Sequence, residues 1–348
     1  MGKKANIALF IPHAGCKNAC SFCNQRLISG KQTVPTAQEI TKQLQQAVEY
    51  LNPANTTEIA FFGGSFTALD EGYMVSLLQA AQPFLGQKGI TGIRVSTRPD
   101  AITHDILQLL KSYGVTAVEL GAQSTNDEVL TLNRRGHTYG HVVTAATLIK
   151  EQGLELGLQM MTGLYGSSET IDRQTAGDFI ALSPKTVRIY PTVVFPDTYL
   201  YQLYRQGIYA PQTVEQAVAQ CSELLVMFEQ AGISVIRLGL HGDSSQNGGI
   251  GPVHPALREL CLGELFYNAI CEILPAHWKT VTVLTHPVQI SQGVGQNRKN
   301  ILRLAQKGIS CKVVGDEGIP RNSVGITRKE NSHVPEILGS TGLQIISR

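Results

Sequence analysis

The chain has 348 residues, enough for two ordinary domains or for one large α/β barrel with an extension. Apolar residues make up 43% and charged residues 16%, a composition that excludes intrinsic disorder and collagen-like fibres. No run approaches the roughly 18 consecutive apolar residues of a membrane helix, and the chain does not begin like a signal peptide. We therefore expect a soluble, cytoplasmic protein with no membrane partner.

The predicted strands are short runs of β-branched and aliphatic residues that alternate with amphipathic stretches. They cover residues 6–11, 58–62, 93–97, 116–120, 154–161, 187–194 and 234–238. The first intervening helix begins at a capping box formed by Thr36 and Glu39, and it carries Ile40 and Leu44 on one face. Strands buried on both faces and separated by helices indicate a parallel sheet of βαβ units.

The fold class is therefore α/β, with a full or partial (β/α) barrel of parallel strands. A Rossmann or flavodoxin-like sheet is the alternative. In both architectures the functional site lies at the carboxyl ends of the strands, and the polar motifs of this chain fall there.

A run of turn-forming residues at 242–251 predicts a boundary between two domains. Residues 1–242 would form the barrel and residues 252–348 a small C-terminal α/β extension. The extension is predicted to hold a long helix at 255–274, a strand at 281–285, a basic helix at 297–306 and short strands near Lys312 and Gln344. No acidic residue lies between Glu272 and Asp316, while six Lys and Arg residues do, which is a mild indication of a polyanionic partner.

Cysteine usage separates into two groups. Cys16, Cys20 and Cys23 lie within eight residues, a spacing that indicates a metal site in a reducing compartment. The other four, which we expect to be small core residues, are Cys221, Cys261, Cys271 and Cys311. Three thiolates can bind a 4Fe–4S cluster and leave one iron open to a small molecule, whereas zinc would need a fourth ligand such as His13.

The cysteine loop, with Phe22 directly before Cys23, resembles the signature of the radical S-adenosylmethionine (SAM) superfamily. The resemblance implies that Cys16, Cys20 and Cys23 are the catalytic cluster ligands. It also implies that SAM binds the open iron and yields a 5′-deoxyadenosyl radical. An electron donor of the flavodoxin or ferredoxin type follows from this chemistry.

Further motifs resemble the Elongator catalytic subunit branch, which is related to oxygen-independent coproporphyrinogen oxidases. They stand at successive strand ends, and they are Phe-Gly-Gly-Ser-Phe-Thr-Ala from Phe62, Ser-Thr-Arg-Pro-Asp from Ser96, Glu-Leu-Gly-Ala-Gln-Ser from Glu119, Arg-Gly-His-Thr from Arg135, Gln-Met-Met-Thr-Gly from Gln159 and Ile-Tyr-Pro-Thr from Ile189. No acetyl-CoA loop of the Elongator type follows, so the resemblance covers the radical SAM part only.

The resemblance assigns cofactor contacts to several of these residues. Gly63, Gly64 and Ser65 correspond to the loop that binds the methionine part of SAM, and a side chain at Gly64 is expected to block SAM while sparing the cluster. Gln123 can hydrogen-bond SAM, and Arg135, or its neighbour Arg134, can pair with the SAM carboxylate. Gln159 stands where the relatives carry an acid or a histidine.

Substrate contacts are predicted at Arg98 and Tyr190 in the barrel and at Arg298 and Lys299 in the basic segment. Strand alternation, counted from Leu120 as an inward residue, predicts that Glu119 points out of the barrel.

The sequence thus predicts a radical SAM enzyme that modifies a tRNA or RNA nucleoside, with a wobble uridine as the substrate that the resemblance implies. One alternative is a radical SAM enzyme acting on a small molecule such as a tetrapyrrole. Another is a non-catalytic binding protein in which metal only holds the loop together.

Overall fold

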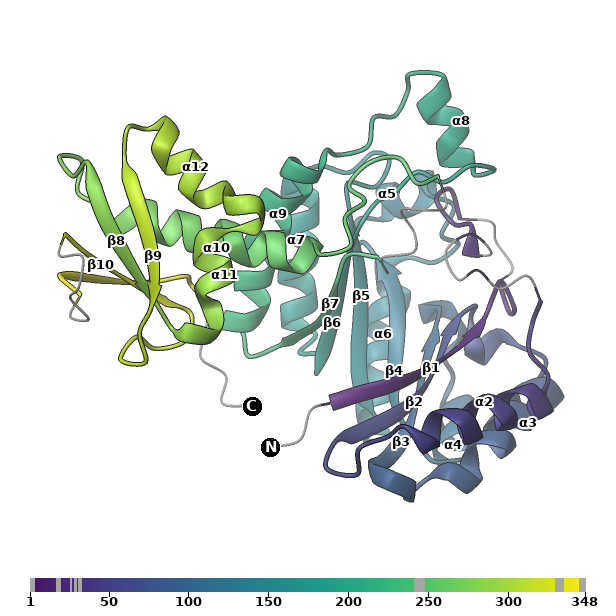
Figure 1. The fold of residues 1–348 in the computed structure, drawn as a ribbon. Coiled ribbons are helices and arrows are strands. Elements are labelled where there is room, and N and C mark those ends of the chain that lie inside the picture. Colours follow the sequence, from purple (N-terminus) through teal and green to yellow (C-terminus); the bar gives the residue numbers. More distant parts are fainter. Residues whose placement is uncertain are drawn as a thin grey trace.

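The computed structural model describes residues 4–16, 20–25, 27, 30, 33–240, 248–328 and 335–343. These residues form two sheets, a larger one near the amino terminus and a smaller one near the carboxyl terminus (Figure 1). The predicted strand near Gln344 and most of the predicted boundary at 242–251 lie outside the described residues.

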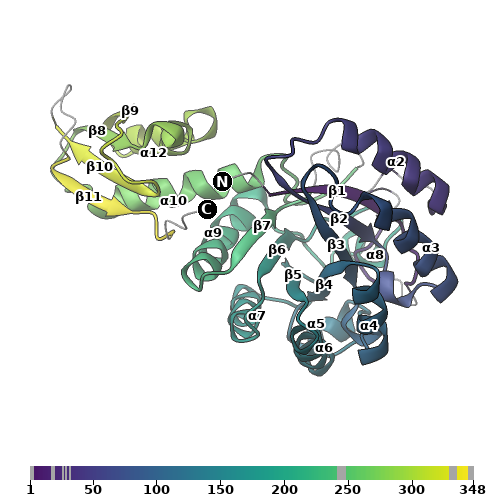
Figure 2. The ribbon, with the colours of Figure 1, turned by 90° about the horizontal axis from the view of Figure 1, so that it is seen from below.

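The larger sheet contains seven strands in sequence order, and each pairs in parallel with the next. The strands are β1 (Lys4–Ile11), β2 (Thr56–Gly63), β3 (Ile90–Thr97), β4 (Val115–Gln123), β5 (Glu155–Thr162), β6 (Thr186–Pro191) and β7 (Ser234–Leu238). Among the described residues β1 does not pair with β7, so the sheet curls into a partial barrel (Figure 2). The barrel prediction is confirmed, because Rossmann and flavodoxin sheets reverse their strand order and this one does not.

Helices cover the outer face of the curled sheet (Figure 2). They are α2 (Ala37–Glu49), α3 (Glu71–Ala81), α4 (His104–Ser112), α5 (Asp127–Leu132), α6 (Tyr139–Glu151), α7 (Glu169–Ala181) and α9 (Val214–Gln230). Helix α8 (Tyr199–Arg205) lies beyond the carboxyl ends of the strands instead (Figure 1). Helix α2 begins at the predicted capping box, in which Glu39 accepts from the Thr36 backbone at 2.7 Å and Thr36 accepts from the Glu39 backbone at 3.3 Å.

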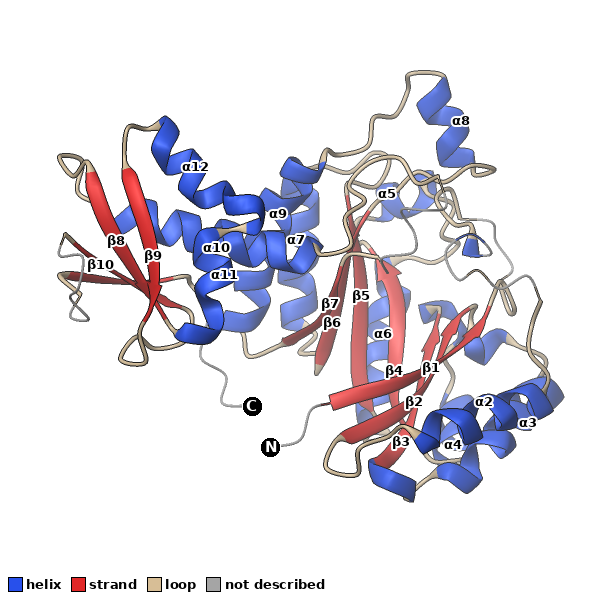
Figure 3. Ribbon diagram, in the orientation of Figure 1, coloured by secondary structure: helices blue, strands red, loops and turns tan. Residues whose placement is uncertain are grey.

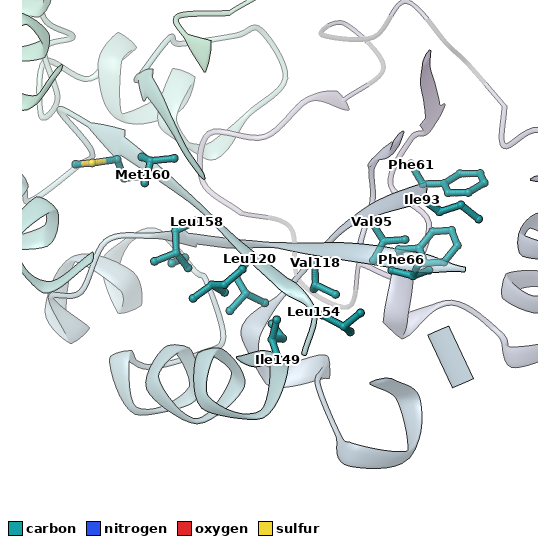
Figure 4. Packing of buried hydrophobic residues seen from close by; sticks show 14 of the residues in the cluster. Phe61, Phe66, Ile93, Val95, Val118, Leu120, Ile149, Leu154, Leu158 and Met160 are labelled. Atoms are coloured by element: carbon teal, nitrogen blue, oxygen red, sulfur yellow. The ribbon is translucent and has the colours of Figure 1, made fainter. Parts of the chain in front are cut away.

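The main core lies between the sheet and these helices. Val118 and Leu120 of β4 pack there near Ile149 of α6, and Phe61 stacks on Phe66 with ring centroids 4.9 Å apart (Figure 4). Large apolar side chains on every strand therefore hold the helices against the outer face. The inner face combines polar residues with aromatic ones such as Phe10 and Phe62.

The smaller sheet has the order β11-β10-β8-β9 and carries its helices on one face (Figure 3). Its strands are β8 (Thr280–Thr285), β9 (Ser310–Gly315), β10 (Ser323–Thr327) and β11 (Ile337–Ser340), and its helices are α10 (Leu257–Ile273), α11 (Ile290–Val294) and α12 (Lys299–Gln306). Strands β8 and β9 are parallel, whereas β10 runs antiparallel to β8 and β11.

Helix α10 packs in both cores of the chain. Leu257 and Cys261 belong to the barrel core, while Phe266 and Ile270 belong to the second core beside Trp278. The division into domains at 242 and 252 stays a prediction, since one helix contributes to both cores. No helix among the described residues combines the length and the apolar character needed to cross a membrane.

Candidate active site

A cavity of about 290 Å³ lies at the carboxyl ends of the barrel strands. All of the site residues predicted in the barrel line it, and they are Cys16, Cys20, Phe22, Cys23, Gly63, Gly64, Ser65, Arg98, Gln123, Arg135, Gln159 and Tyr190. The parallel sheet explains the convergence, because segments distant in sequence end at the same edge of the barrel.

The three cysteines of the loop after β1 lie on one side of this cavity. The loop turns back through backbone hydrogen bonds from Cys16 to the His13 carbonyl at 3.3 Å and from Cys23 to the Cys20 carbonyl at 3.2 Å. Burial, followed by the neighbouring thiols of Cys20 and Cys16, raises the pKa of Cys23 to about 12. The three thiols belong to one short loop and line one cavity, an arrangement that suits ligands of one shared group.

Residues 63–65 pack directly on the cysteine loop. The Gly64 backbone donates to the Ile11 carbonyl at 2.8 Å, and the Ser65 backbone donates to the Ala14 carbonyl at 2.9 Å. A β-carbon on Gly64 would lie 1.9 Å from the Ala14 oxygen. The prediction for a Gly64 side chain is corrected: it would collide with the cysteine loop itself rather than fill only the SAM site.

The two adjacent arginines after α5 have different environments. Arg135 Nη1 donates to Cys20 Sγ at 3.0 Å, and its Nη2 donates to the Gly121 carbonyl at 2.6 Å. Arg134 instead stacks over the ring of Tyr199, with its guanidinium carbon 3.6 Å from the ring centroid. Of the two, Arg135 is the arginine that lines the cavity.

Arg98 brings a second guanidinium to the cavity wall. It pairs with both carboxylate oxygens of Asp100, at 2.9 and 3.0 Å. Its Nη1 and the Nε of Arg135 are buried and have no hydrogen-bond partner among the described residues. Two guanidiniums with unused donors suit an anionic ligand such as a carboxylate or a phosphate.

Gln123 and Gln159 form a hydrogen-bonded pair across neighbouring strands. Gln159 Nε2 donates to Gln123 Oε1 at 3.1 Å, and Gln123 ends β4 with a left-handed φ of 71°. The two amides keep further donors and acceptors for a ligand, since each amide can make several hydrogen bonds.

Glu119 points into the barrel, so the prediction that it points outward was wrong. It is 1% exposed, and its carboxylate accepts from Arg188 Nε at 2.7 Å and from Ser96 Oγ at 3.3 Å. The guanidinium of Arg188 lies 3.4 Å from the Tyr190 hydroxyl, to which it donates, and 4.7 Å from the centroid of the Phe62 ring.

Arg188 was not predicted from the sequence as a site residue. It lines the cavity and forms a buried ion pair with Glu119. The alternation of side chains along β4 could have indicated that Glu119 faces inward. Residues 119, 121 and 123 share one face of the strand, so a Gln123 that faces the cavity implies a Glu119 that faces it too.

Arg298 and Lys299 do not line the cavity. They stand at the start of α12, in the unit built on the smaller sheet (Figure 1). If both belong to a substrate site, they contact a part of the substrate other than the one in the barrel.

The residues present fit an iron–sulfur cluster bound by three thiolates. The loop supplies the thiols, and Arg135 donates to the Cys20 sulfur, a type of contact that adjusts the potential of such clusters. His13, the fourth ligand in the zinc alternative, already accepts from the Gln25 backbone at 3.0 Å through Nε2. In the described part of the chain no three His, Cys, Asp or Glu side chains are close enough together to hold a metal ion on their own.

Comparison with known proteins agrees with this geometry. Residues 10–173 match the model of the Radical SAM superfamily, and residues 184–266 match the model of the Radical_SAM C-terminal domain. The chain belongs to the radical SAM superfamily. As a radical SAM enzyme, it has a 4Fe–4S cluster and SAM as its cofactors.

Similar curated proteins are Elongator-like. The chain is 28% identical over 196 residues to a tRNA uridine(34) acetyltransferase of Methanocaldococcus jannaschii, a match that covers 51% of this chain and 36% of that protein. It is 26% identical over 205 residues to human Elongator complex protein 3, covering 53% of this chain and 38% of that protein. The matched region thus spans little more than a third of these relatives.

A solved structure confirms the fold. The archaeal Elp3 of Methanocaldococcus infernus superimposes with a TM-score of 0.54 at 20% identity, covering 71% of this chain and 62% of that one. The partial barrel is therefore of the radical SAM type.

Proposed function

We propose that this enzyme modifies a uridine of tRNA, and that it acts in the cytoplasm. The observation that carries the proposal is the cavity that brings three cysteines, the 63–65 loop and two guanidiniums together at the carboxyl ends of the strands. Curated proteins similar in sequence include enzymes named for tRNA uridine(34), which supports the choice of substrate.

When bound, the cluster and SAM supply a 5′-deoxyadenosyl radical that can remove a hydrogen atom from the substrate. Cys16, Cys20 and Cys23 would hold the cluster, and Phe22 would cover it beside Cys23. Arg135 contacts Cys20 and has a free Nε, so it is placed to bind the SAM carboxylate next to the cluster. Gly63, Gly64 and Ser65 would form the wall next to the cysteine loop through their backbone.

The remaining polar residues would orient the adenosine of SAM and the substrate. The amide pair of Gln123 and Gln159 suits ribose hydroxyl groups, which both donate and accept. Arg98 can bind a phosphate through its unpaired Nη1. Arg188 donates to the Tyr190 hydroxyl, and both residues line the cavity that would receive the base.

The substrate assignment is tested by measuring 5′-deoxyadenosine release from anaerobically reconstituted protein with SAM and dithionite. Unmodified tRNA is expected to stimulate the release, and the modified nucleoside should appear in digested tRNA. A flavodoxin or ferredoxin should replace dithionite as the reductant. Cys20→Ala protein serves as the control, because it should lose both the cluster and the release.

Release that does not respond to tRNA would contradict the tRNA substrate and favour a small molecule. Protein that holds stoichiometric zinc and no sulfide would contradict the assignment as a radical SAM enzyme. These two results are separable, because metal and sulfide content are measured before any substrate is added.

A further inference from the structure

Helices α11 and α12 and the loop between them are inserted between two neighbouring parallel strands. Strand β8 leads through a turn at Pro287–Gln289 into α11, a tight loop follows at 295–298, and α12 leads back to β9. In KH domains a GXXG loop clamps the backbone of four nucleotides; the loop here, Gly-Gln-Asn-Arg at 295–298, shares the first glycine but not the second.

The basic segment divides into separate groups in the structure. Arg303 donates to both carboxylate oxygens of Glu264, at 2.5 and 3.0 Å, and its guanidinium lies 3.5 Å from the centroid of the Tyr267 ring. Lys307 lies over the same ring at 5.3 Å. These two cations therefore serve the packing of α12 on α10.

Arg298 and Lys299 at the loop are different, because the structure gives them no ion pair or hydrogen bond with a described side chain. Arg298 is exposed and Lys299 is half-buried. The unneutralised positive charge of the helix pair is thus concentrated at residues 298–299, beside a loop with no acidic residue.

Asn300, the second residue of α12, anchors the start of that helix to α10 and α11 next to the loop. This buried side chain donates to the carbonyls of Gly263, Gln292 and Gly293 at 2.9, 3.1 and 3.2 Å. At Gly295, with φ of 74°, a β-carbon would lie 2.8 Å from the Asn300 side chain, so glycine is required there. The start of α12 is thus fixed against α10 and α11 beside the loop, and ordering of this kind before binding reduces the entropy lost on binding.

The surface of the same helix pair carries exposed apolar side chains. Val288, Ile290 and Leu302 are 61%, 37% and 56% exposed, and they are three of the nine large apolar residues exposed in the described part of the chain. Strand β9 is also an edge strand, with no partner on its outer side among the described residues. Unstacked bases can use both features, since they pack on apolar surface and hydrogen-bond to free backbone groups.

We propose that the α11–α12 unit binds single-stranded RNA, with residues 295–299 against the phosphates and the apolar surface against the bases. The unit combines positive charge at the loop, exposed apolar side chains at Val288, Ile290 and Leu302, and a free edge on β9. The inference rests on the proposed function for the choice of RNA, and it adds a second contact outside the barrel.

The test measures the affinity of the full-length, cluster-loaded protein for a labelled uridine-rich oligoribonucleotide by fluorescence anisotropy at several salt concentrations. The variant combines Asn297→Asp and Arg298→Asp. Both positions have left-handed φ values of 52° and 61°, which Asp tolerates, so the loop conformation should persist. Affinity for the oligoribonucleotide should fall about tenfold or more. The slope of log affinity against log salt concentration should become smaller by about one, as expected for the loss of one phosphate contact.

The matched control combines Gln87→Asp and Lys88→Asp. It makes the same three-unit change of charge at two exposed residues, and Lys88 also has a left-handed φ of 39°. These residues precede β3, at the opposite end of the barrel strands from the cavity. The control should bind RNA within about twofold of the original protein. Circular dichroism and iron content check that both variants fold and load.

Equal losses in the two variants, or no loss in the loop variant, would overturn the proposal. Duplex RNA that binds as tightly as the single strand, or polyglutamate that competes as well as RNA, would also overturn it. If the loop variant alone loses affinity while tRNA fails to stimulate 5′-deoxyadenosine release, the RNA site stands and the proposed tRNA reaction falls.

Discussion

Arg134 and Arg135 show how two identical neighbouring residues acquire different roles. Arg135 touches the cysteine loop and lines the cavity, whereas Arg134 stacks on Tyr199 at the surface. Arg135→Gln should weaken SAM binding about tenfold to a hundredfold, because it removes a charge-assisted hydrogen bond to the SAM carboxylate. Arg134→Gln should bind SAM normally. Equilibrium dialysis of SAM against cluster-loaded protein measures both, and equal losses would mean that Arg135 is not the carboxylate ligand.

Glu119 and Arg188 are a buried ion pair on the inner face of the barrel, 1% and 7% exposed. Arg188→Met leaves a buried carboxylate without its partner and should reduce the free energy of unfolding by about 3–5 kcal/mol. Breaking the exposed pair of Arg173 and Glu223 with Arg173→Met should cost less than about 1 kcal/mol. Denaturant titration compares the two variants, and similar costs would show that the inner pair is accessible to water.

His137 should make stability depend on pH. Burial, followed by the positive charge of Arg135, lowers its pKa from 6.5 to about 4. The unfolded chain therefore takes up a proton at this residue between pH 7 and pH 5 while the folded chain does not. The free energy of unfolding should fall by about 2 kcal/mol over that range from this residue alone.

His137→Asn should remove this part of the pH dependence, whereas His104→Asn, at an exposed histidine on α4, should not. Unfolding titrations at pH 7 and pH 5 give the comparison. An unchanged pH dependence in His137→Asn protein would show that the folded chain accepts the proton.

At the scale of elements, the loops after β1 and β2 behave as one unit. Because a β-carbon on Gly64 would strike the Ala14 carbonyl at 1.9 Å, Gly64→Ala should displace the cysteine loop and reduce iron and sulfide per chain by about half or more. Gly177→Ala is the control, since its β-carbon on α7 would meet no atom within 4 Å. Full cluster content together with lost SAM binding in Gly64→Ala would restore the original prediction that the glycine serves SAM alone.

The elements also show what the sequence could and could not predict. Periodicity located all seven barrel strands, and the capping box located the start of α2, because both depend on local patterns. Every barrel residue predicted for the site lies at the cavity, since parallel strands bring their ends together. The phase of β4 was wrong because Val118, Leu120 and Ala122 are apolar toward the helices, and apolar character alone does not tell the outer core of a barrel from its interior.

The two short strands β10 and β11 pair through contacts between residues distant in sequence, and their four or five residues carry little periodic signal. The left-handed turn at Asn297 and Arg298 was likewise not predictable, because neither residue requires it. The turn lies shortly before Asn300, whose buried hydrogen bonds to α10 and α11 form only in the folded unit.

At the scale of the whole molecule, helix α10 contributes to both hydrophobic cores, although the sequence predicts two separate domains. Its first turns pack on the barrel through Leu257 and Cys261, and its last turns pack under the smaller sheet through Phe266 and Ile270. Unfolding either core would expose one half of this helix. The two units are therefore expected to unfold together, even though each has a sheet of its own.

Trp278 allows this cooperativity to be measured, because it is the single tryptophan of the chain and lies in the second core. Its fluorescence reports the smaller unit, while far-ultraviolet circular dichroism is dominated by the barrel. The two signals should change at the same denaturant concentration, as two-state unfolding requires. Leu77→Ala, a fully buried change in the barrel core, should cost about 2–5 kcal/mol and shift the Trp278 transition by the same amount as the dichroism. A Trp278 transition that does not move with Leu77→Ala would show that α10 does not couple the two cores, and the C-terminal unit would then be a separately folding RNA-binding module.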